Sequence, residues 1–405
     1  MNSSSMSAAE LKAAISLSAV FFLRMLPLFM ILPVLSLAGS SYQSSTPQLL
    51  GLALGIYGLT QASLQIPFGM LSDRFGRKPI ICLGLIIFVA GSLLAAMTDS
   101  IYGLILGRAL QGAGAVAAAI MALAADLTTE QHRTKVMACI GMSIGLSFSV
   151  AFILGPLLYT HIGIQGLFYL SVCIAILAII TLLIIVPNPT RHADEGRHAI
   201  SLQGFKNVVS NFYLIKLDIS IFSSHLILMA NFVVIPVALR DIIQLQSTSH
   251  WQVYLGVLFT SLFIMVPFII FGERLKKIKL FFVTSIILII LSQLGLSFGH
   301  TSLPLLVLFL ILFFGAFNYL EALLPSEVSK ATSIDTKGTA LGVYSSSQFI
   351  GIFIGGLSGG FFHQYFGIAS VHFLCLFIAL LWLCLVIYLP DHKNSYENTL
   401  EESML

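Results

Sequence analysis

Charged side chains are scarce in this chain. Only 9% of its 405 residues are Asp, Glu, Lys or Arg, whereas 58% are hydrophobic and the mean hydropathy is +0.98. Soluble domains carry roughly 25% charged residues, so the composition excludes a soluble core of this size. It predicts a protein whose partner is the lipid bilayer. The net charge of +3 provides no clustered basic face, so we predict no binding to nucleic acid.

Cysteines are also sparse, and known catalytic motifs are absent. The five cysteines lie scattered within apolar runs, without the spacing of a metal site, at Cys82, Cys139, Cys173, Cys375 and Cys384. We interpret them as small packing residues. The sequence contains no Walker loop for ATP, no HExxH and no GxSxG pattern. We therefore expect no enzyme activity, no cofactor and no metal site.

Long apolar runs dominate the sequence. Backbone groups in hydrocarbon must form their hydrogen bonds within the segment, so each run of about 20 residues predicts a spanning helix. Turn residues and charges separate these runs, which we place at residues 12–37, 48–72, 79–98, 101–125, 136–160, 165–187, 211–239, 251–271, 279–299, 303–328, 337–363 and 368–389. The first run is too long for the apolar part of a signal peptide, so we expect it to remain as a span.

The longest polar stretch divides these runs into two sets of six. We predict an N-terminal half at residues 1–187, a linker at 188–210, a C-terminal half at 211–389 and a polar tail at 390–405. Lys and Arg lie almost entirely in the even-to-odd connections, and the opposite loops hold only Arg240. Because cationic loops stay on the cytoplasmic side, both termini and the linker are predicted to be cytoplasmic.

The two halves resemble each other. In the fifth and eleventh runs the matching residues are Gly141, Phe148, Phe152 and Gly155, and Gly342, Phe349, Phe353 and Gly356. Duplicated halves that face each other across a pseudo-two-fold axis place a binding site between them near the bilayer midplane.

The strongest motif follows the second run. Residues 69–78 read G-M-L-S-D-R-F-G-R-K and resemble the G-x-L-x-D-R-x-G-R-K loop of the major facilitator superfamily. Glycines permit a tight turn, and a carboxylate can accept hydrogen bonds from guanidinium groups. The resemblance implies a conformational latch made of Gly69, Asp73, Arg74, Gly76, Arg77 and Asp126. The alternative is a cationic loop that only sets topology.

Two further motifs point to drug:proton antiporters of this superfamily. Residues 108–114, R-A-L-Q-G-A-G, look like the R-x-x-Q-G-x-G segment of the fourth span, and the resemblance implies that Arg108 takes part in proton coupling. The alternative is that Arg108 extends to the membrane interface. Gly155 and Pro156 are similar to the core of the fifth-span motif and are expected to pack helices. Tyr159 and Thr160 replace the glycines that usually follow.

The resemblance covers nearly the whole chain and is greatest to the YajR-type branch. It implies an all-α polytopic membrane protein with the major facilitator fold, two pseudo-symmetric six-helix bundles and alternating access. It also implies residence in a bacterial inner membrane, with the protein acting as a monomer. Members of the branch can carry a soluble domain after the twelfth helix, and no role of such a domain is transferred to this chain.

Few ionisable residues lie inside the runs, and such residues are functional candidates in lipid. Glu321 is our first candidate for the proton carrier and His225 the second, because a buried carboxyl or imidazole can exchange protons. A fixed ion pair or an interhelical hydrogen bond is the alternative for each. Asp218 lies in the same run as His225. Arg24 keeps its proton, so it either sets the local potential or binds an anionic substrate.

Uncharged polar residues within the runs predict the lining of a substrate cavity. With Arg24, the candidates are Tyr57, Gln61, Gln111, Asn231 and Asn318. Together these features predict a secondary active transporter that exports small amphiphilic molecules in exchange for protons. The alternative is proton-coupled or facilitated uptake of a small metabolite. A membrane-embedded enzyme or receptor-like protein is disfavoured, because it would show larger loops and polar clusters at one interface.

Overall fold

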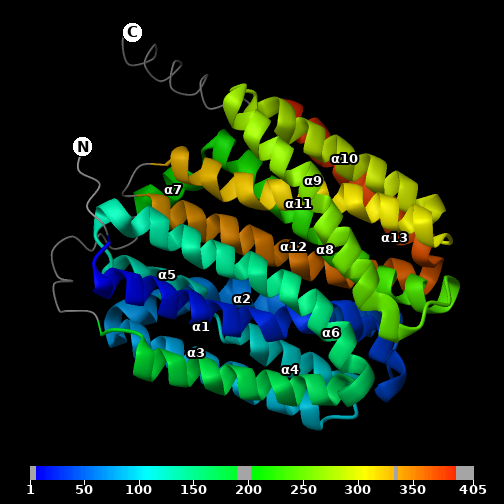
Figure 1. The fold of residues 1–405 in the computed structure, drawn as a ribbon, viewed down its shortest axis with the longest axis horizontal. Helices are drawn as coiled ribbons and strands as arrows, with labels where there is room; N and C mark the ends of the chain where they lie inside the picture. The colour runs from blue at the N-terminus through cyan, green and yellow to red at the C-terminus, as the bar shows by residue number, and fades with distance from the viewer. Residues whose placement is uncertain (1–5, 189–201, 333–335, 389–405) are drawn as a thin grey trace. The chain divides into compact units, whose positions relative to one another are not determined.

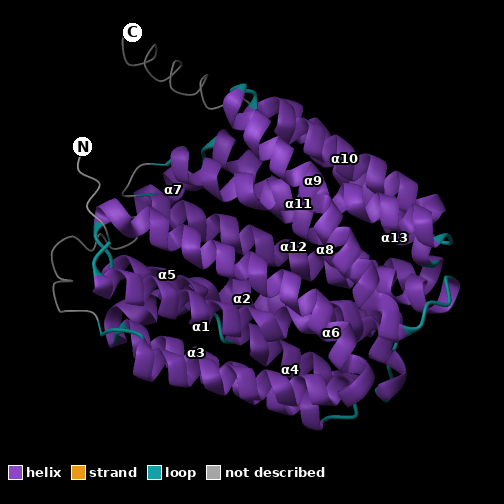
Figure 2. Ribbon diagram, in the orientation of Figure 1, coloured by secondary structure: helices purple, strands orange, loops and turns teal. Residues whose placement is uncertain are grey.

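A computed structural model describes residues 6–188, 202–332 and 336–388 of the chain. These residues form helices and no strand (Figure 2), and one isolated bridge joins Gln43 to Ser100. The predicted all-α fold is confirmed. The predicted tail at 390–405 and residues 189–201 of the predicted linker lie outside the described residues.

The described helices group into two compact units (Figure 1). Among the described residues, one unit comprises 6–188 together with 244–255, and the other comprises 202–243, 256–332 and 336–388. The first contains α1 (Ala8–Leu35), η1 (Ser36–Ser41), α2 (Pro47–Phe75), α3 (Arg77–Met97), α4 (Ile101–Ala113), α5 (Ala117–Asp126), α6 (Glu130–Ile180), η2 (Thr181–Ile185) and η4 (Ser247–Ser249). We call it the N-unit.

The second unit, the C-unit, holds the remaining helices. They are α7 (Leu202–Val209), α8 (Phe212–Val237), η3 (Ala238–Ile242), α9 (His250–Arg274), α10 (Ile278–Gly299), α11 (Leu303–Lys330), α12 (Lys337–Phe366) and α13 (Ile368–Tyr388). The first residues of α9, up to Leu255, belong to the N-unit. Helix α7 lies within the segment predicted as a linker, which the apolar-run pattern did not indicate.

In the described residues, 11 helical stretches are long and apolar enough to cross a membrane. One of them contains α6, whose 51 residues are far more than one bilayer crossing of about 20 residues requires. The helical path of α6 breaks at Gly163, where φ is 65° and ψ is −175°. Glycine tolerates this positive φ without steric cost. Helix α6 therefore supplies both the fifth and the sixth predicted spans.

The fourth predicted span, 101–125, is not one continuous helix. Helix α4 ends at Ala113, α5 begins at Ala117, and Gly114 has a non-helical φ of −73° and ψ of 54°. The apolar pattern runs through this break, so hydropathy alone could not reveal it. The break places an interrupted helix within the N-unit.

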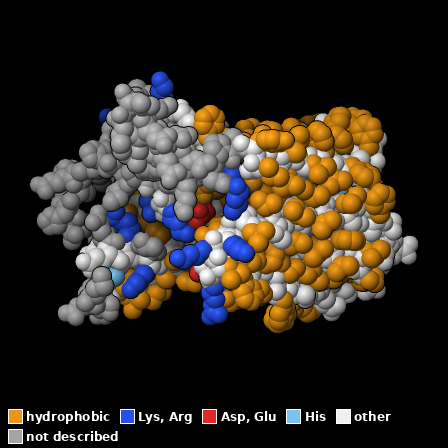
Figure 3. All heavy atoms as spheres, turned by 90° about the horizontal axis from the view of Figure 1, so that it is seen from above, with side chains coloured by type: hydrophobic (Ala, Val, Ile, Leu, Met, Phe, Trp, Pro, Cys, Tyr) orange, Lys and Arg blue, Asp and Glu red, His pale blue; other side chains and the backbone are white. Residues whose placement is uncertain are grey.

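The described surface carries many large apolar side chains. Among them, Tyr388 is 86% exposed, Ile184 75%, Phe298 71% and Phe263 70%. On the face drawn in Figure 3, apolar side chains cover a broad area, while Lys and Arg gather toward one end. Exposed apolar area of this extent is unfavourable in water and is expected where lipid is the solvent.

The first and fifth spans of each unit pack backbone against backbone. A Cβ placed on Gly155 of α6 would lie 2.5 Å from the Met30 carbonyl oxygen of α1. In α12, Gly351 and Gly355 make the same kind of approach to carbonyl oxygens of α8, at 2.3 and 2.2 Å. Small residues permit such close helix contacts in membranes. The second of these glycines, Gly355, directly precedes the Gly356 that the sequence pattern matched to Gly155.

Candidate functional site

The C-unit brings together the two residues predicted to carry protons. His225 on α8 is 5% exposed, and its Nε2 lies 3.7 Å from Oε2 of Glu321 on α11. This distance is too long for a hydrogen bond. Gln348 on α12 bridges the gap, because its Nε2 lies 2.8 Å from His225 Nε2 and 3.4 Å from Glu321 Oε1. Three helices therefore converge on one polar cluster.

The contacts of His225 fit one tautomer of the neutral ring. With the Gln348 NH₂ group assigned to the side of Nε2, that nitrogen accepts, and the matching tautomer carries its proton on Nδ1. Nδ1 lies 3.2 Å from the Ile221 carbonyl oxygen, which can accept that proton. Glu321 Oε2 is buried without a hydrogen-bond partner among the described residues. A proton added to His225 Nε2 would place a new donor 3.7 Å from this oxygen.

Other predicted residues of the C-unit lie on the same helices, α8 and α11. Asn318, one turn before Glu321 on α11, donates to the Ser261 hydroxyl of α9 at 3.2 Å. Asn231 on α8 is 1% exposed, and neither polar atom of its side chain has a partner in the described part of the chain. The ring of Phe317 lies 5.3 Å from His225 and closes its apolar side. Asp218 is half-buried on α8.

In the N-unit, Arg108 is fully buried at the centre of a hydrogen-bonded chain. Its Nε donates to the Ala53 carbonyl at 3.2 Å, and its Nη1 donates to Gln111 Oε1 at 2.7 Å. Gln111 Nε2 in turn donates to the Ser92 hydroxyl at 2.8 Å. The guanidinium lies 4.6 Å from the ring centre of Tyr57. Arg108 is 0% exposed, so protein atoms enclose its whole side chain.

Arg24 approaches the same region from α1 and is 1% exposed. Its Nη2 donates to Gln61 Oε1 at 3.4 Å and to the Gly114 carbonyl at 3.3 Å, which lies at the break between α4 and α5. The guanidinium also lies 4.7 Å from the ring centre of Phe88. The predicted cavity residues Arg24, Tyr57, Gln61 and Gln111 therefore gather in the N-unit with Arg108.

The glycines of the R-x-x-Q-G-x-G segment explain how these side chains reach the interior. A Cβ on Gly112 would lie 2.1 Å from the Tyr57 carbonyl oxygen of α2, and one on Gly114 would lie 2.3 Å from the Gly84 carbonyl oxygen of α3. Real side chains do not tolerate such distances, so only glycine allows α4 to pack this closely. The glycines of the motif therefore allow close helix packing, and its first residue is the buried Arg108.

The loop after α2 forms an ion-pair cluster around Arg77. Arg77 lies 2.6 Å from Asp73 Oδ1 and 2.9 Å from Asp126 Oδ2, at the end of α5, and it donates to the Ser72 hydroxyl at 2.7 Å. Gly76 makes the turn between α2 and α3 with φ of 94°. Arg74 lies 5.3 Å from the Phe75 ring centre. A Cβ on Gly69 would meet only Ala118, at 3.7 Å, so packing does not require that glycine.

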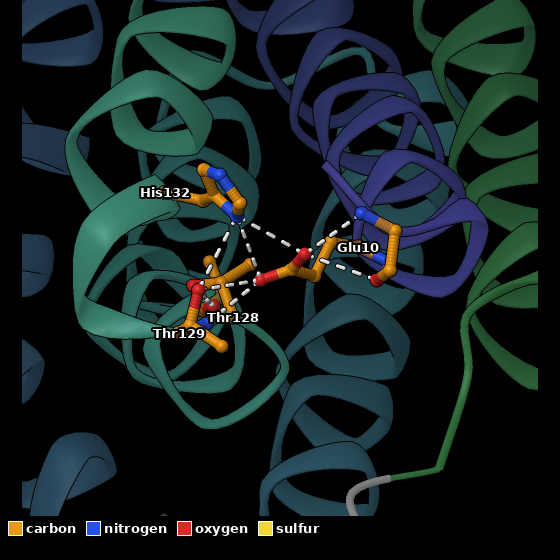
Figure 4. A network of polar contacts seen from close by, with 6 residues as sticks. Glu10, Thr128, Thr129 and His132 are labelled. Atoms are coloured by element: carbon orange, nitrogen blue, oxygen red, sulfur yellow. Dashed lines mark hydrogen bonds and ion pairs between the residues drawn. The ribbon is translucent and has the colours of Figure 1, made fainter. Parts of the chain in front are cut away.

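A second polar network, which the sequence interpretation missed, joins the first turns of α1 and α6 (Figure 4). Glu10 Oε1 accepts from the backbone N–H of Thr129 at 3.0 Å and from its hydroxyl at 2.8 Å. His132 Nδ1 lies 3.1 Å from Oε2, and Thr128 bonds back to the Ala124 carbonyl of α5 at 2.7 Å. The only signal in the sequence is the capping pattern from Ser7 to Glu10, which indicates a helix start and not this partner.

Comparisons with known proteins agree with this architecture. The family model described as Major Facilitator Superfamily matches residues 17–278 and 217–403. The inner membrane transport protein YajR of Escherichia coli K12 is 45% identical over 383 residues, which cover 95% of this chain and 84% of that protein. An uncharacterized transporter of Buchnera aphidicola subsp. Baizongia pistaciae is 36% identical over 374 residues, covering 92% and 95%.

Solved structures show the same fold at low sequence identity. A D-xylose–proton symporter superposes with a TM-score of 0.77 at 14% identity, covering 95% of this chain and 99% of that one. A bacterial homologue of the human lysosomal transporter Spinster gives 0.76 at 13% identity, covering 95% and 97%. With the family match over both halves and the two relatives above 30% identity, these findings show that this multi-pass membrane protein belongs to the major facilitator superfamily of secondary transporters.

Proposed function

We propose that this transporter exports small amphiphilic molecules in exchange for protons, with Glu321 as the proton carrier and His225 as its partner. The observation that carries the proposal is the bridge of Gln348 between these two residues. They are ionisable groups on two helices whose apolar runs contain few others. Ionisable groups inside a membrane are costly and mark ion pathways.

One proton can change the contacts of all three side chains. When His225 gains a proton on Nε2, that nitrogen becomes a donor, so the Gln348 NH₂ group must turn away and the amide oxygen can replace it. An imidazolium also attracts the Glu321 carboxylate across the present gap of 3.7 Å. Protonation of Glu321 instead gives a hydroxyl that can donate to His225 Nε2 once the Gln348 NH₂ group has turned away from that nitrogen. Either event pulls α11 toward α8, which would link proton binding to helix movement.

We propose that the two units are the moving halves of the transporter and that a single chain suffices for transport. Two of the three coupling candidates, Glu321 and His225, lie in the C-unit, and the third, Arg108, lies in the N-unit. The predicted orientation, with both termini in the cytoplasm of a cell whose inner membrane holds the protein, follows from the uneven distribution of Lys and Arg. The ion pairs of Arg77 would stabilise one of the two conformations, in accordance with the latch that the motif implies.

Proteoliposomes with an imposed pH gradient test the proposed function. An antiporter accumulates substrate in acid-inside vesicles whatever its orientation, whereas a symporter accumulates it in acid-outside vesicles. We would screen cationic, neutral and anionic fluorescent amphiphiles and subtract uptake by protein-free vesicles. Accumulation in acid-inside vesicles supports the proposal. Accumulation in acid-outside vesicles would establish proton-coupled uptake instead, and equilibration without regard to the gradient would establish a facilitator.

A further inference from the structure

The N-unit buries two positive charges without a negative partner. Arg24 and Arg108 are 1% and 0% exposed, and neither contacts an Asp or Glu among the described residues. The apolar runs of α1, α2 and α4 contain no acidic residue between Lys12 and Ser72 or between Ile101 and Ala125. Taking an uncompensated charge out of water costs several kcal/mol. An arrangement of this kind requires another source of compensation.

Part of the compensation is visible in the structure. Each guanidinium lies over an aromatic ring, Arg24 over Phe88 and Arg108 over Tyr57, and each donates to a backbone carbonyl. Aromatic faces and carbonyl dipoles stabilise a cation, although neither neutralises it. The charges of Arg24 and Arg108 also act on each other. The pair is therefore held in place yet remains positively charged overall.

Four donor atoms in this region have no hydrogen-bond partner in the described part of the chain. They are Arg24 Nε, Arg24 Nη1, Arg108 Nη2 and Gln61 Nε2. They come from α1, α4 and α2, and all four are buried. Gln65 Oε1, one turn from Gln61 on α2, is a buried acceptor that also has no partner there, and a single oxygen cannot satisfy all four donors. Donors thus remain unsatisfied at a positively charged site.

The break between α4 and α5 also favours a negatively charged ligand at this site. Arg24 donates to the Gly114 carbonyl at the break, and α5 starts three residues later without a side-chain cap. The N-terminus of a helix favours negative charge, and discontinuous helices often form ligand sites in transporters. A carboxylate has two oxygens that together offer about four acceptor sites. That number equals the four unpartnered donor atoms, which come from both guanidinium groups and from Gln61.

We propose that Arg24 and Arg108, with Gln61, bind the carboxylate group of the transported molecule. The inference rests on the proposed function only in treating the anion as cargo. Both guanidinium groups are closed off in this conformation, so the carboxylate enters when the N-unit helices are more open. Because guanidinium does not lose its proton near neutral pH, binding at this site does not itself depend on proton coupling by Glu321.

The direct test compares benzoate with benzamide, which has nearly the same shape and no charge. Isothermal titration of the purified full chain should show benzoate binding at least about tenfold tighter than benzamide. This comparison needs no variant. Equal affinities, or no detectable binding of either, would mean that water alone satisfies the buried donors and would overturn the proposal.

Variants then locate the site. Arg24→Gln should weaken benzoate binding at least about tenfold, with Arg24→Lys between it and the wild type because lysine keeps the charge and loses the fork. The matched control is Arg240→Gln, an exposed arginine paired with Asp241, which should change affinity less than about twofold. A monodisperse Arg24→Gln protein with unchanged affinity would contradict the proposal.

The pH dependence of benzoate affinity distinguishes the arginine site from the proton coupling proposed for Glu321. Benzoate affinity should stay constant between about pH 6 and 8.5, where arginine remains charged and carboxylates are ionised. An affinity that follows histidine titration, near about pH 6.5, would place the anion elsewhere and reject the arginine site. If benzoate binds as expected while transport shows no proton coupling, the proposed function fails and the arginine site stands.

Discussion

Gln348 on α12 bridges His225 and Glu321, because its amide nitrogen lies 2.8 Å from the imidazole and 3.4 Å from the carboxylate. The two ionisable groups themselves are 3.7 Å apart and form no direct hydrogen bond. A side chain with both a donor and an acceptor can respond to a proton on either neighbour. This relationship makes Gln348 the positioning residue of the proposed coupling cluster.

Replacing Gln348 should therefore disturb coupling more than folding. We expect Gln348→Leu to lower gradient-driven transport by about tenfold or more, because one hydrogen bond that senses charge, worth about 1.5–3 kcal/mol, is lost. The measurement is initial uptake in acid-inside proteoliposomes. Gln364→Leu, an exposed position on the same helix, is the matched control. Equal activity of the two variants would remove Gln348 from the mechanism.

Gly112 should not tolerate even one added methyl group. A Cβ there would lie 2.1 Å from the Tyr57 carbonyl oxygen and 2.2 Å from the Thr60 hydroxyl oxygen, so α2 and α4 must move apart. We expect Gly112→Ala to destabilise the protein by about 1–3 kcal/mol, measured as a fall in melting temperature in detergent.

Gly145→Ala provides the control for that experiment. Gly145 lies within α6, and a Cβ there would meet nothing within 4 Å. Alanine is favoured over glycine in a helix by about 0.5–1 kcal/mol, so this variant should melt at the same temperature or slightly higher. If both variants melt alike, the close packing of α2 and α4 is not a structural requirement.

The two carboxylates that contact Arg77 should differ in importance. Asp73 is 51% exposed and lies on the last turn of α2, four residues before Arg77, whereas Asp126 is 23% exposed and joins Arg77 to the end of α5. Exposed pairs contribute only about 0–1 kcal/mol. We therefore expect Asp126→Asn to alter transport rate more than Asp73→Asn, because it alone releases α3 from α5. A larger effect of Asp73→Asn would indicate that Asp73 has a partner in another conformation.

Glu10 should contribute strongly to the stability of the N-unit. Its carboxylate accepts hydrogen bonds from the N–H and hydroxyl groups of both Ser7 and Thr129 (Figure 4). The side chain of a glutamine at this position keeps one acceptor oxygen. Its NH₂ group is a donor and would face the donor groups of Ser7 or Thr129. We expect Glu10→Gln to lower the melting temperature by several degrees, and Lys12→Gln, an exposed position on the same helix turn, to have little effect. A reversed order would show that the network does not stabilise α1.

Much of the fold could be predicted because lipid imposes simple rules. Apolar runs of bilayer length predict the spans, and the interval between the fifth and sixth runs predicts the turn at Gly163 inside α6. The interruption of the fourth span at Gly114 escaped this reasoning, since Ala115 and Val116 are as apolar as the helix around them. Hydropathy reports solvent preference, whereas the break depends on close contacts with Gly84 and Arg24.

The sequence indicates the members of the candidate site and does not indicate which of them are in contact. Glu321 and His225 stood out because ionisable residues are rare in apolar runs, yet their bridge through Gln348 depends on the rotation of three separate helices. Arg24 and Arg108 were given different roles from the sequence, whereas the structure gathers both around Tyr57 and Gln61. The contact of Glu10 with Thr129 spans 119 positions, and no local pattern indicates it.

Proton movement that accompanies substrate transport shows whether Glu321 carries the proton. Vesicles would contain a pH-sensitive dye at equal internal and external pH, and an inward gradient of a transported amphiphile would be applied. We expect protons to leave, so the internal pH rises with the wild type and with Glu327→Gln, a control on the same helix whose carboxylate binds Tyr213 and Lys330. With Glu321→Gln the internal pH should stay constant. A rise of equal rate in Glu321→Gln would contradict the assignment of Glu321 as the proton carrier.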